Sequence, residues 1–203
     1  LEFRRVLFRS HAMFMTYKSF LNLVEYLKED YFIIMPTLDG HDVEESSTFL
    51  SIDDEVDKIL TYLKGNNIDE LDFILGTSLG AIIAFAVYHR NIVHINKVFL
   101  DGGPFLKFGS LFQKIAMKKF WRICYLMRLS PQNGNERLDK LFPGLGKLMS
   151  NVCCYISKES VENLSRACYS FPLPKLDETA QKSVTFIYGT KRSEEHTSEL
   201  QSQ

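Results

Sequence analysis

The chain contains 203 residues, of which 45% are apolar and 24% are charged, and its formal net charge is −1. This length fits one domain, the near-neutral charge argues against a nucleic-acid partner, and no apolar run approaches the roughly 20 residues that cross a bilayer. The four cysteines lack metal-ligand spacing, so we expect neither a metal site nor a disulfide framework. They are predicted to be free thiols in a reducing cytoplasm: Cys124, Cys153, Cys154 and Cys168.

The two ends of the chain differ in character from the rest. Residues 1–10 and 192–203 resemble translated sequencing-adapter sequence, and we set them aside from the functional argument as one would a tag. We therefore expect the native part to cover about residues 11–191. The chain would then be a fragment, truncated at both ends.

Helices and strands are predicted to alternate through the first hundred residues. One helical face is indicated by apolar residues at i, i+3, i+4 and i+7: Phe20, Leu23, Val24 and Leu27. Residues 31–36 form a continuous apolar run, typical of a strand buried on both faces of a parallel sheet. Ser51 can cap a second helix, which Gly65 ends and whose apolar stripe comprises Ile52, Val56, Ile59, Leu60 and Leu63.

A Gly-x-Ser-x-Gly motif at residues 76–80 centres on Ser78 and joins an apolar run at 71–75 to an apolar stretch at 79–90. A strand, a tight turn and a helix in this order are typical of a nucleophile elbow. Glycines leave room where a Cβ would clash, so the serine can stand at the tip of the turn. The motif predicts a nucleophilic serine. A glycine-rich turn with a helix-capping serine is the structural alternative.

A further strand is predicted at 97–101, and the alternation of strands with helices implies a parallel sheet in an α/β fold. The charge then changes along the chain. Residues 11–104 carry 6 Lys or Arg and 15 Asp or Glu, whereas residues 105–176 carry 12 and 4. The change falls at Gly-Gly-Pro, residues 102–104, which is a natural boundary signal.

Residues 105–176 show helical patterns alone, which predicts a lid or cap inserted between two strands. We expect one helix with a stripe that begins at Phe108, a second near 136–149 and a third near 158–169. Residues 183–188 then return to a strand pattern.

The first helix of this segment is predicted to be amphipathic. Its basic residues are expected on one face, namely Lys107, Lys114, Lys118 and Arg122, and its apolar residues on another, namely Phe112, Ile115, Ala116 and Ile123. A helix that packs over an active site would explain this pattern. The alternative is a basic surface that contacts anionic lipid or attracts an anionic acyl substrate.

Together these features resemble the α/β-hydrolase family, and within it the small capped serine esterases and lipase-like hydrolases. The resemblance covers nearly all of residues 11–191. It rests on the elbow, on the order of strands and helices, on Leu-Asp-Gly-Gly-Pro at 100–104 and on a helical cap before Phe-Ile-Tyr-Gly-Thr at 186–190. It implies an α/β-hydrolase core at 11–104, a helical cap at 105–176 and a return strand of the core at 177–191.

The resemblance also implies roles for individual residues. Ser78 would be the nucleophile, and the backbone N–H groups of Leu79 and Met13 would form the oxyanion hole. Met13 belongs to His11-Ala12-Met13, which resembles the His-Gly oxyanion loop of the family with alanine in place of glycine. Asp101 is an alternative acid, or else a turn residue before two glycines. The usual acid and the base histidine would lie beyond Lys191, and no cofactor or metal is implied.

We therefore expect a serine hydrolase of carboxylic esters that works through an acyl-enzyme, present here as an inactive fragment without its base and acid. The alternative is a non-catalytic binding protein of the same fold. The expected partner is a small acyl ester, with weak contact to a membrane surface through the basic cap.

The expected truncation also leads to a prediction about the sheet. In the family, a strand lies between those that match 31–36 and 71–75, and buried strands without a partner leave costly unpaired backbone groups. We expect about residues 5–9 to fill this gap as a surrogate strand. Residues 183–188 should form an edge strand, and residues 192–203 a tail.

Overall fold

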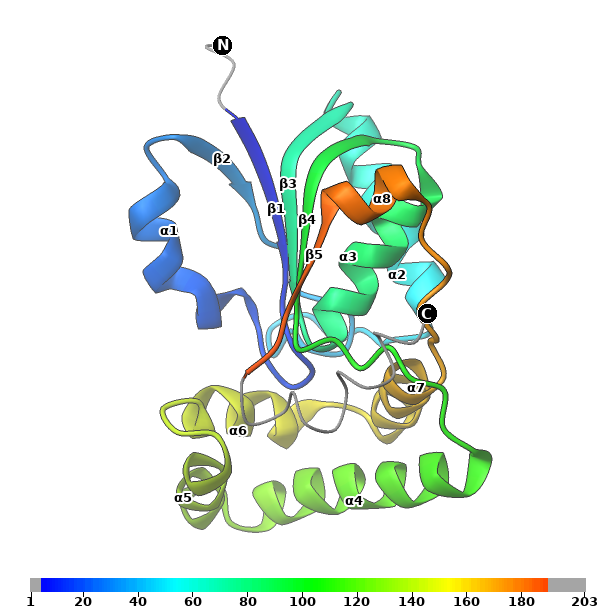
Figure 1. Cartoon of the computed structure of the whole chain (residues 1–203). Helices are drawn as coiled ribbons and strands as arrows, with labels where there is room; N and C mark the ends of the chain where they lie inside the picture. Colours follow the sequence, from blue (N-terminus) through cyan, green and yellow to red (C-terminus); the bar gives the residue numbers. More distant parts are fainter. Residues whose placement is uncertain (1–4, 190–203) are drawn as a thin grey trace.

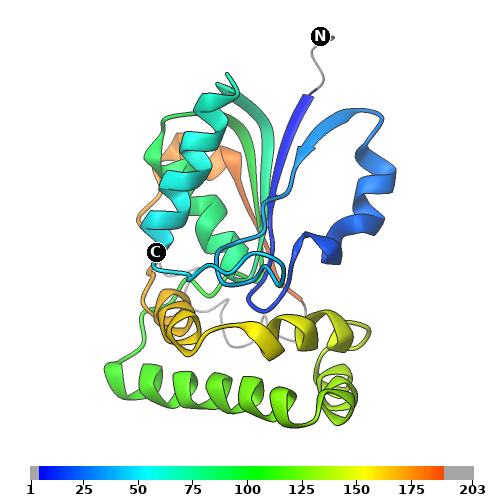
Figure 2. The same ribbon diagram turned by 180° about the vertical axis from the view of Figure 1, so that it is seen from behind.

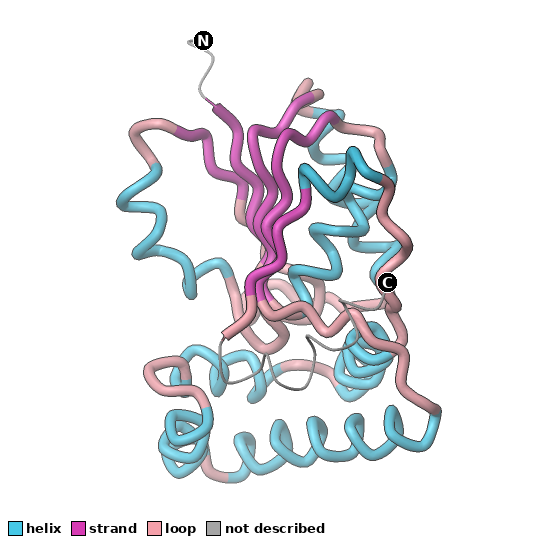
Figure 3. Tube along the Cα trace, viewed as in Figure 1, coloured by secondary structure: helices cyan, strands magenta, loops and turns pink. Residues whose placement is uncertain are grey.

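The computed structural model describes residues 5–189. Within this range five strands form one parallel sheet in the order β2-β1-β3-β4-β5 (Figures 1 and 3). The strands are β1 (Arg5–Ser10), β2 (Tyr31–Ile34), β3 (Glu70–Thr77), β4 (His94–Asp101) and β5 (Val184–Ile187). Because all of them run the same way, their carboxyl ends meet at one edge of the sheet, where ligands of such folds bind.

Helices cover both faces of the sheet (Figure 1). One face carries the short helix η1 (Tyr17–Phe20) and α1 (Leu21–Leu27). The other carries α2 (Ile52–Gly65), α3 (Leu79–Arg90) and α8 (Glu178–Ser183). Helix α3 is apolar on all sides and is buried from Leu79 to Val87. It is therefore enclosed between the sheet and α2, as expected of a helix without a polar face.

Between β4 and β5 the chain forms helices: α4 (Ser110–Leu129), α5 (Pro131–Leu141), α6 (Gly146–Tyr155), α7 (Lys158–Tyr169) and then α8. Helices α4–α7 lie beyond the carboxyl ends of the strands in both views (Figures 1 and 2). The prediction of helices alone is confirmed, apart from an isolated bridge between Lys107 and Ser170. We call α4–α7 the helical cap. Among the described residues no helix has the length and apolarity to cross a bilayer.

The strand expected at about residues 5–9 is confirmed. Leu7 of β1 pairs with Ile33 of β2 on one side and with Phe73 of β3 on the other, and Leu7 is fully buried. The backbone of β1 thus pairs with two neighbouring strands that would otherwise leave backbone groups unpaired. The edge position of β5 is confirmed as well, while residues 192–203 lie outside the described residues.

Two predictions about elements were wrong. The strand expected at 31–36 ends at Ile34 and lies at the edge of the described sheet, and Phe32 is 50% exposed, so it is not buried on both faces. The helix expected near 136–149 is two helices, α5 and α6, because Pro143 and Gly144 interrupt it. Gly144 has a φ of 79°, a conformation that breaks a helix and suits glycine.

The cysteines follow the sequence prediction in most respects. All four are free thiols, and three are buried, whereas Cys154 is only partly buried. Cys124 of α4 and Cys153 of α6 interact within the cap, and this contact, with burial, raises the pKa of the Cys153 thiol. The thiols therefore act as small apolar side chains of the cap core.

Candidate active site

Ser78 stands at the sharp turn between β3 and α3. Its backbone has φ 54° and ψ −113°, outside the usual regions for a residue with a side chain, which is the strained geometry of a nucleophile elbow. The Ser78 N–H donates to the carbonyl oxygen of Asp101, at 2.8 Å, and this bond fixes the turn to the end of β4. The Ser78 side chain is partly exposed, as access by a substrate requires.

The glycines on either side of Ser78 are required by close backbone contacts. A Cβ on Gly76 would lie 2.0 Å from the carbonyl oxygen of Gly80, and a Cβ on Gly80 would lie 2.3 Å from the carbonyl oxygen of Ser10. Both distances are far below a van der Waals contact, and backbone atoms cannot rotate away as a flexible side chain can. Any other residue at either position would therefore displace α3 from the sheet.

The two segments expected to supply the oxyanion hole end at the same edge of the sheet. Ser10 pairs with Gly76, so the turn that follows β1 emerges beside the elbow that follows β3. This turn contains Met13 and is closed by a hydrogen bond from the Met15 N–H to the Ala12 carbonyl, at 3.1 Å. Leu79 is the first residue of α3, where an amide N–H has no acceptor within the helix. The roles of Met13 and Leu79 stay predictions.

A family model described as "alpha/beta hydrolase fold" matches residues 7–197. The chain belongs to the alpha/beta hydrolase fold family. A comparison with curated proteins found no match. In this member of the family the turn at Ser78 joins the end of β3 to the start of α3, and the role of Ser78 stays a prediction.

Solved structures of similar shape are alpha/beta hydrolases and esterases. An alpha/beta hydrolase family protein from Desulfitobacterium hafniense is 20% identical over 92% of this chain and 76% of its own, with a TM-score of 0.72. A carboxylesterase of Nitrososphaera gargenis is 18% identical over 93% and 73%, with a TM-score of 0.68. An enol-lactonase from Burkholderia xenovorans LB400 is 12% identical over 98% and 90%, also at 0.68. At these identities the likeness shows the shared fold.

His11 is fully buried at the base of the turn that follows β1, which we call the oxyanion turn after its predicted role. Its Nδ1 lies 2.9 Å from the Ala12 carbonyl, and its Nε2 accepts the Leu38 N–H at 2.9 Å. Burial, with repulsion from His41, lowers the pKa of His11 to about 3. The ring is therefore neutral, with its proton on Nδ1, and both nitrogens are engaged with the backbone. His11 therefore orders the turn and is a weak base.

His41 packs edge-on against His11, with 5.0 Å between the ring centroids. Its Nδ1 lies 3.0 Å from the Asp39 carbonyl, and burial lowers its pKa to about 4. The Nε2 is buried without a partner among the described residues. The sequence analysis did not anticipate this buried pair.

The other described histidines lie away from the elbow. His89 is eleven residues along α3 from Ser78, which separates their backbones by about 16 Å. His94 pairs with Glu70 at the amino ends of β4 and β3, about 23 Å along the strand from Asp101. Within residues 5–189, no histidine forms a hydrogen bond with Ser78.

Asp101 ends β4 opposite Thr77, beside the elbow. Its carbonyl accepts the Ser78 N–H, and its carboxylate favours the charged form of Arg9 in β1. This position keeps both interpretations open, since Asp101 holds the turn through its backbone and presents a carboxylate at the active edge. The structure gives its carboxylate no described histidine to orient.

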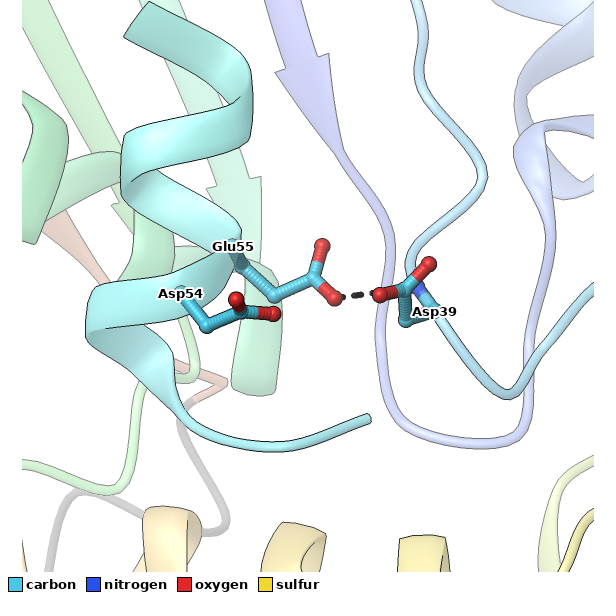
Figure 4. A group of neighbouring side chains, drawn as sticks. All are labelled: Asp39, Asp54 and Glu55. Carbon is cyan, nitrogen blue, oxygen red and sulfur yellow. Dashed lines mark hydrogen bonds between the residues drawn. The ribbon is translucent and has the colours of Figure 1, made fainter. Parts of the chain in front are cut away.

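A cluster of three carboxylates was missed by the sequence analysis. Asp39, which follows β2, lies beside Asp54 and Glu55 in the first turn of α2 (Figure 4). The Asp39 N–H donates to Glu55, at 3.1 Å, and burial raises the pKa of Glu55 to about 7. The Lys58 ammonium contacts both Asp39 and Asp54. It supplies the positive charge that a metal ion would otherwise bring.

Proposed function

We propose that the protein is a serine hydrolase of carboxylic esters, with Ser78 as its nucleophile. The observation that carries this proposal is the strained backbone of Ser78 between two glycines whose replacement would collide with backbone. A capping serine would have ordinary φ and ψ values and a side chain bonded to the helix, but Ser78 makes no such bond. Solved structures of similar fold include carboxylesterases, an enol-lactonase and a thioesterase domain, which supports an acyl-transfer substrate class.

In the proposed reaction the Ser78 Oγ attacks the carbonyl carbon of an ester while a base takes its proton. The N–H groups of Leu79 and Met13 donate to the oxyanion that forms, which stabilises charge present only near the transition state. As the intermediate collapses, the base returns this proton to the leaving oxygen. The neutral alcohol departs and an acyl-serine remains. Water then attacks the acyl-serine, with the same base, and releases the acid.

We further propose that none of His11, His41, His89 and His94 is the base. Burial lowers the pKa of the first two to about 3 and about 4, which makes them weak bases, and the other two lie too far from Ser78. Residues 5–189 would therefore supply no base for ester turnover, and Asp101 remains a candidate acid. The four unpaired thiols support a reducing compartment such as the cytoplasm.

A fluorophosphonate probe with mass-spectrometric site mapping tests the nucleophile. We expect slow phosphonylation of Ser78, faster labelling when imidazole is added as an external base, and none in Ser78→Ala. Ser110→Ala is a matched control, because Ser110 is exposed at the start of α4, and it should label as the wild type does. Absence of Ser78 labelling with imidazole present would reject the assignment. Fast labelling without imidazole would reject the proposal that none of these four histidines is the base.

A non-catalytic binding protein is the second candidate. The lack of a histidine bonded to Ser78 in the described range favours it. The two functions differ in what happens to a short aryl ester: a hydrolase releases the phenol in a Ser78-dependent burst, whereas a binding protein retains the intact ester. Recovery of the unchanged ester from a stable complex would support the binding protein.

A further inference from the structure

Helix α4 forms the outer boundary of the helical cap. It packs on α5, α6 and α7, and in both views α6 and α7 lie between it and the sheet (Figures 1 and 2). Its 20 residues span about 30 Å. The helix contains five basic residues and no acidic one, so it carries a strong positive charge along its whole length.

The outward side of α4 mixes apolar and basic residues. Its apolar members are unusually exposed: Leu111 is 72% exposed, Ile115 58% and Leu129 64%. Lys114, Lys118 and Arg122, which are also exposed, fall within the same arc of the helix. We call these six residues the outer face. The prediction of separate basic and apolar faces was wrong for Ile115, which is exposed among the basic residues, whereas Ala116 is buried and Phe112 packs on Phe108 and Tyr169 on another side of α4.

The opposite side of α4 holds the helix on the molecule. Ala116, Cys124 and Met127 are buried there. Phe120 contacts Phe14 of the oxyanion turn, with ring centroids 5.9 Å apart. The outer face takes no part in this packing. Within residues 5–189 its three cations form no ion pair, so both its charge and its apolar area are available to a partner.

We propose that the outer face of α4 docks on an anionic lipid surface, with the helix axis parallel to the membrane plane. Leucine and isoleucine side chains on this face would enter the boundary between headgroups and acyl chains. The lysine and arginine stems would extend toward the anionic headgroups. Basic and apolar groups interleaved on one helical face fit a lipid surface better than an acidic protein surface, which would leave the three apolar side chains without an apolar partner.

The docking would place the cap between the membrane and the sheet, with Phe120 connecting α4 to the oxyanion turn. It does not depend on Ser78 chemistry. Ser78→Ala should bind vesicles as the wild type does, so failure of one proposal is distinguishable from failure of the other.

Vesicle binding by the full chain tests the proposal directly. The sequence contains one tryptophan, Trp121, and it lies on α4. Its fluorescence should be quenched by brominated acyl chains in vesicles of phosphatidylcholine and phosphatidylserine, but not in vesicles of phosphatidylcholine alone. Because exposed charges are screened, binding should weaken as salt is raised.

Two variants divide the outer face into its parts. Lys114→Gln with Lys118→Gln and Arg122→Gln should lower the partition coefficient on the order of a hundredfold, since each basic residue near an anionic surface contributes about fivefold. Leu111→Ser with Ile115→Ser and Leu129→Ser should retain weak binding but lose the quenching. The matched control changes three exposed lysines outside α4, Lys18, Lys64 and Lys175, to Gln and should bind nearly as the wild type does.

Circular dichroism of each variant checks that the fold is retained. Three results would overturn the proposal: no binding to anionic vesicles, equal loss of binding in the control triple variant, or equal quenching in vesicles without phosphatidylserine. A fourth is concentration-dependent self-association in sedimentation, abolished by the α4 variants while vesicle binding persists. That result would assign the outer face to contact between copies of this chain.

Discussion

Residues 11–104 carry 15 acidic and 6 basic side chains, whereas residues 105–176 carry 4 acidic and 12 basic ones. The two regions also differ in how their helices are buried. Helix α3 buries nine consecutive residues between the sheet and α2, but α4 buries three of its 20. A helix inside a layered fold has neighbours all round, while a helix at the boundary of a cap has them on one side. Apolar residues therefore contribute to stability in the first region and remain available for contacts in the second.

The largest expected effect comes from a comparison of two phenylalanines, one in each region. Phe85 of α3 is fully buried against Phe105 and Phe171, with ring centroids 5.8 Å and 6.4 Å away. Phe85→Ala should lower the free energy of unfolding by about 4 kcal/mol, because it leaves a cavity in the core. Phe112→Ala on α4, where the ring is 44% exposed, should cost about 1 kcal/mol. Urea unfolding measures both, and equal losses would remove the distinction between the regions.

Two glycines offer the next largest contrast. Gly80→Ala should cost about 3 kcal/mol, since its Cβ would collide with the Ser10 carbonyl and push α3 from the sheet. Gly109, which precedes α4, has no atom within 4 Å of an added Cβ. Gly109→Ala should therefore stay within about 0.5 kcal/mol of the wild type. A tolerated Gly80→Ala would show that the elbow is looser than its backbone contacts indicate.

Stability should depend on pH through Glu55. Its pKa is raised from 4.5 to about 7, mainly by burial, so the folded state holds a proton that the unfolded chain has released. Stability contributed by this group is therefore lost as pH rises between these values. The free energy of unfolding of Glu55→Gln, measured relative to that of the wild type, should rise by about 2 kcal/mol between pH 5 and pH 8.

A glutamate of the cap is the control for this titration. Glu136 is exposed on α5, and Glu136→Gln should leave the pH dependence of unfolding unchanged. Parallel shifts in both variants would mean that net charge, rather than burial of Glu55, controls the dependence.

The smallest expected effect is the loss of a serine that caps a helix, and both regions contain such a serine. Ser51 caps α2 by accepting the Asp54 N–H at 3.1 Å, and Ser157 caps α7 by accepting the Ser160 N–H at 3.0 Å. Ser51→Ala and Ser157→Ala should each cost about 1 kcal/mol. Thermal unfolding resolves losses of this size. A much larger loss at Ser157 would indicate that its hydroxyl, which also contacts Ser160, supports the join between α7 and Phe49.

Elements with strong local signals could be predicted from the sequence alone. The limits of α3 and α7 matched the expected 79–90 and 158–169, and α2 starts after the predicted cap at Ser51. The turn at Ser78 was predictable because a strand, two glycines and an apolar helix follow one another directly within residues 70–90. The parallel sheet followed from the order of these elements, whereas the need for a strand between β2 and β3 followed from the resemblance to the α/β-hydrolase family.

Tertiary structure alone decided the surroundings of individual side chains. It placed β2 at the described sheet edge, brought His11 beside His41, buried Glu55 near Asp39, and turned Ile115 outward. Helical or strand periodicity shows which residues share a face, but not which element, if any, packs against it. The burial of a side chain, its pKa and its exposed surface all depend on the element that packs against it. For these residues that element comes from a distant part of the chain.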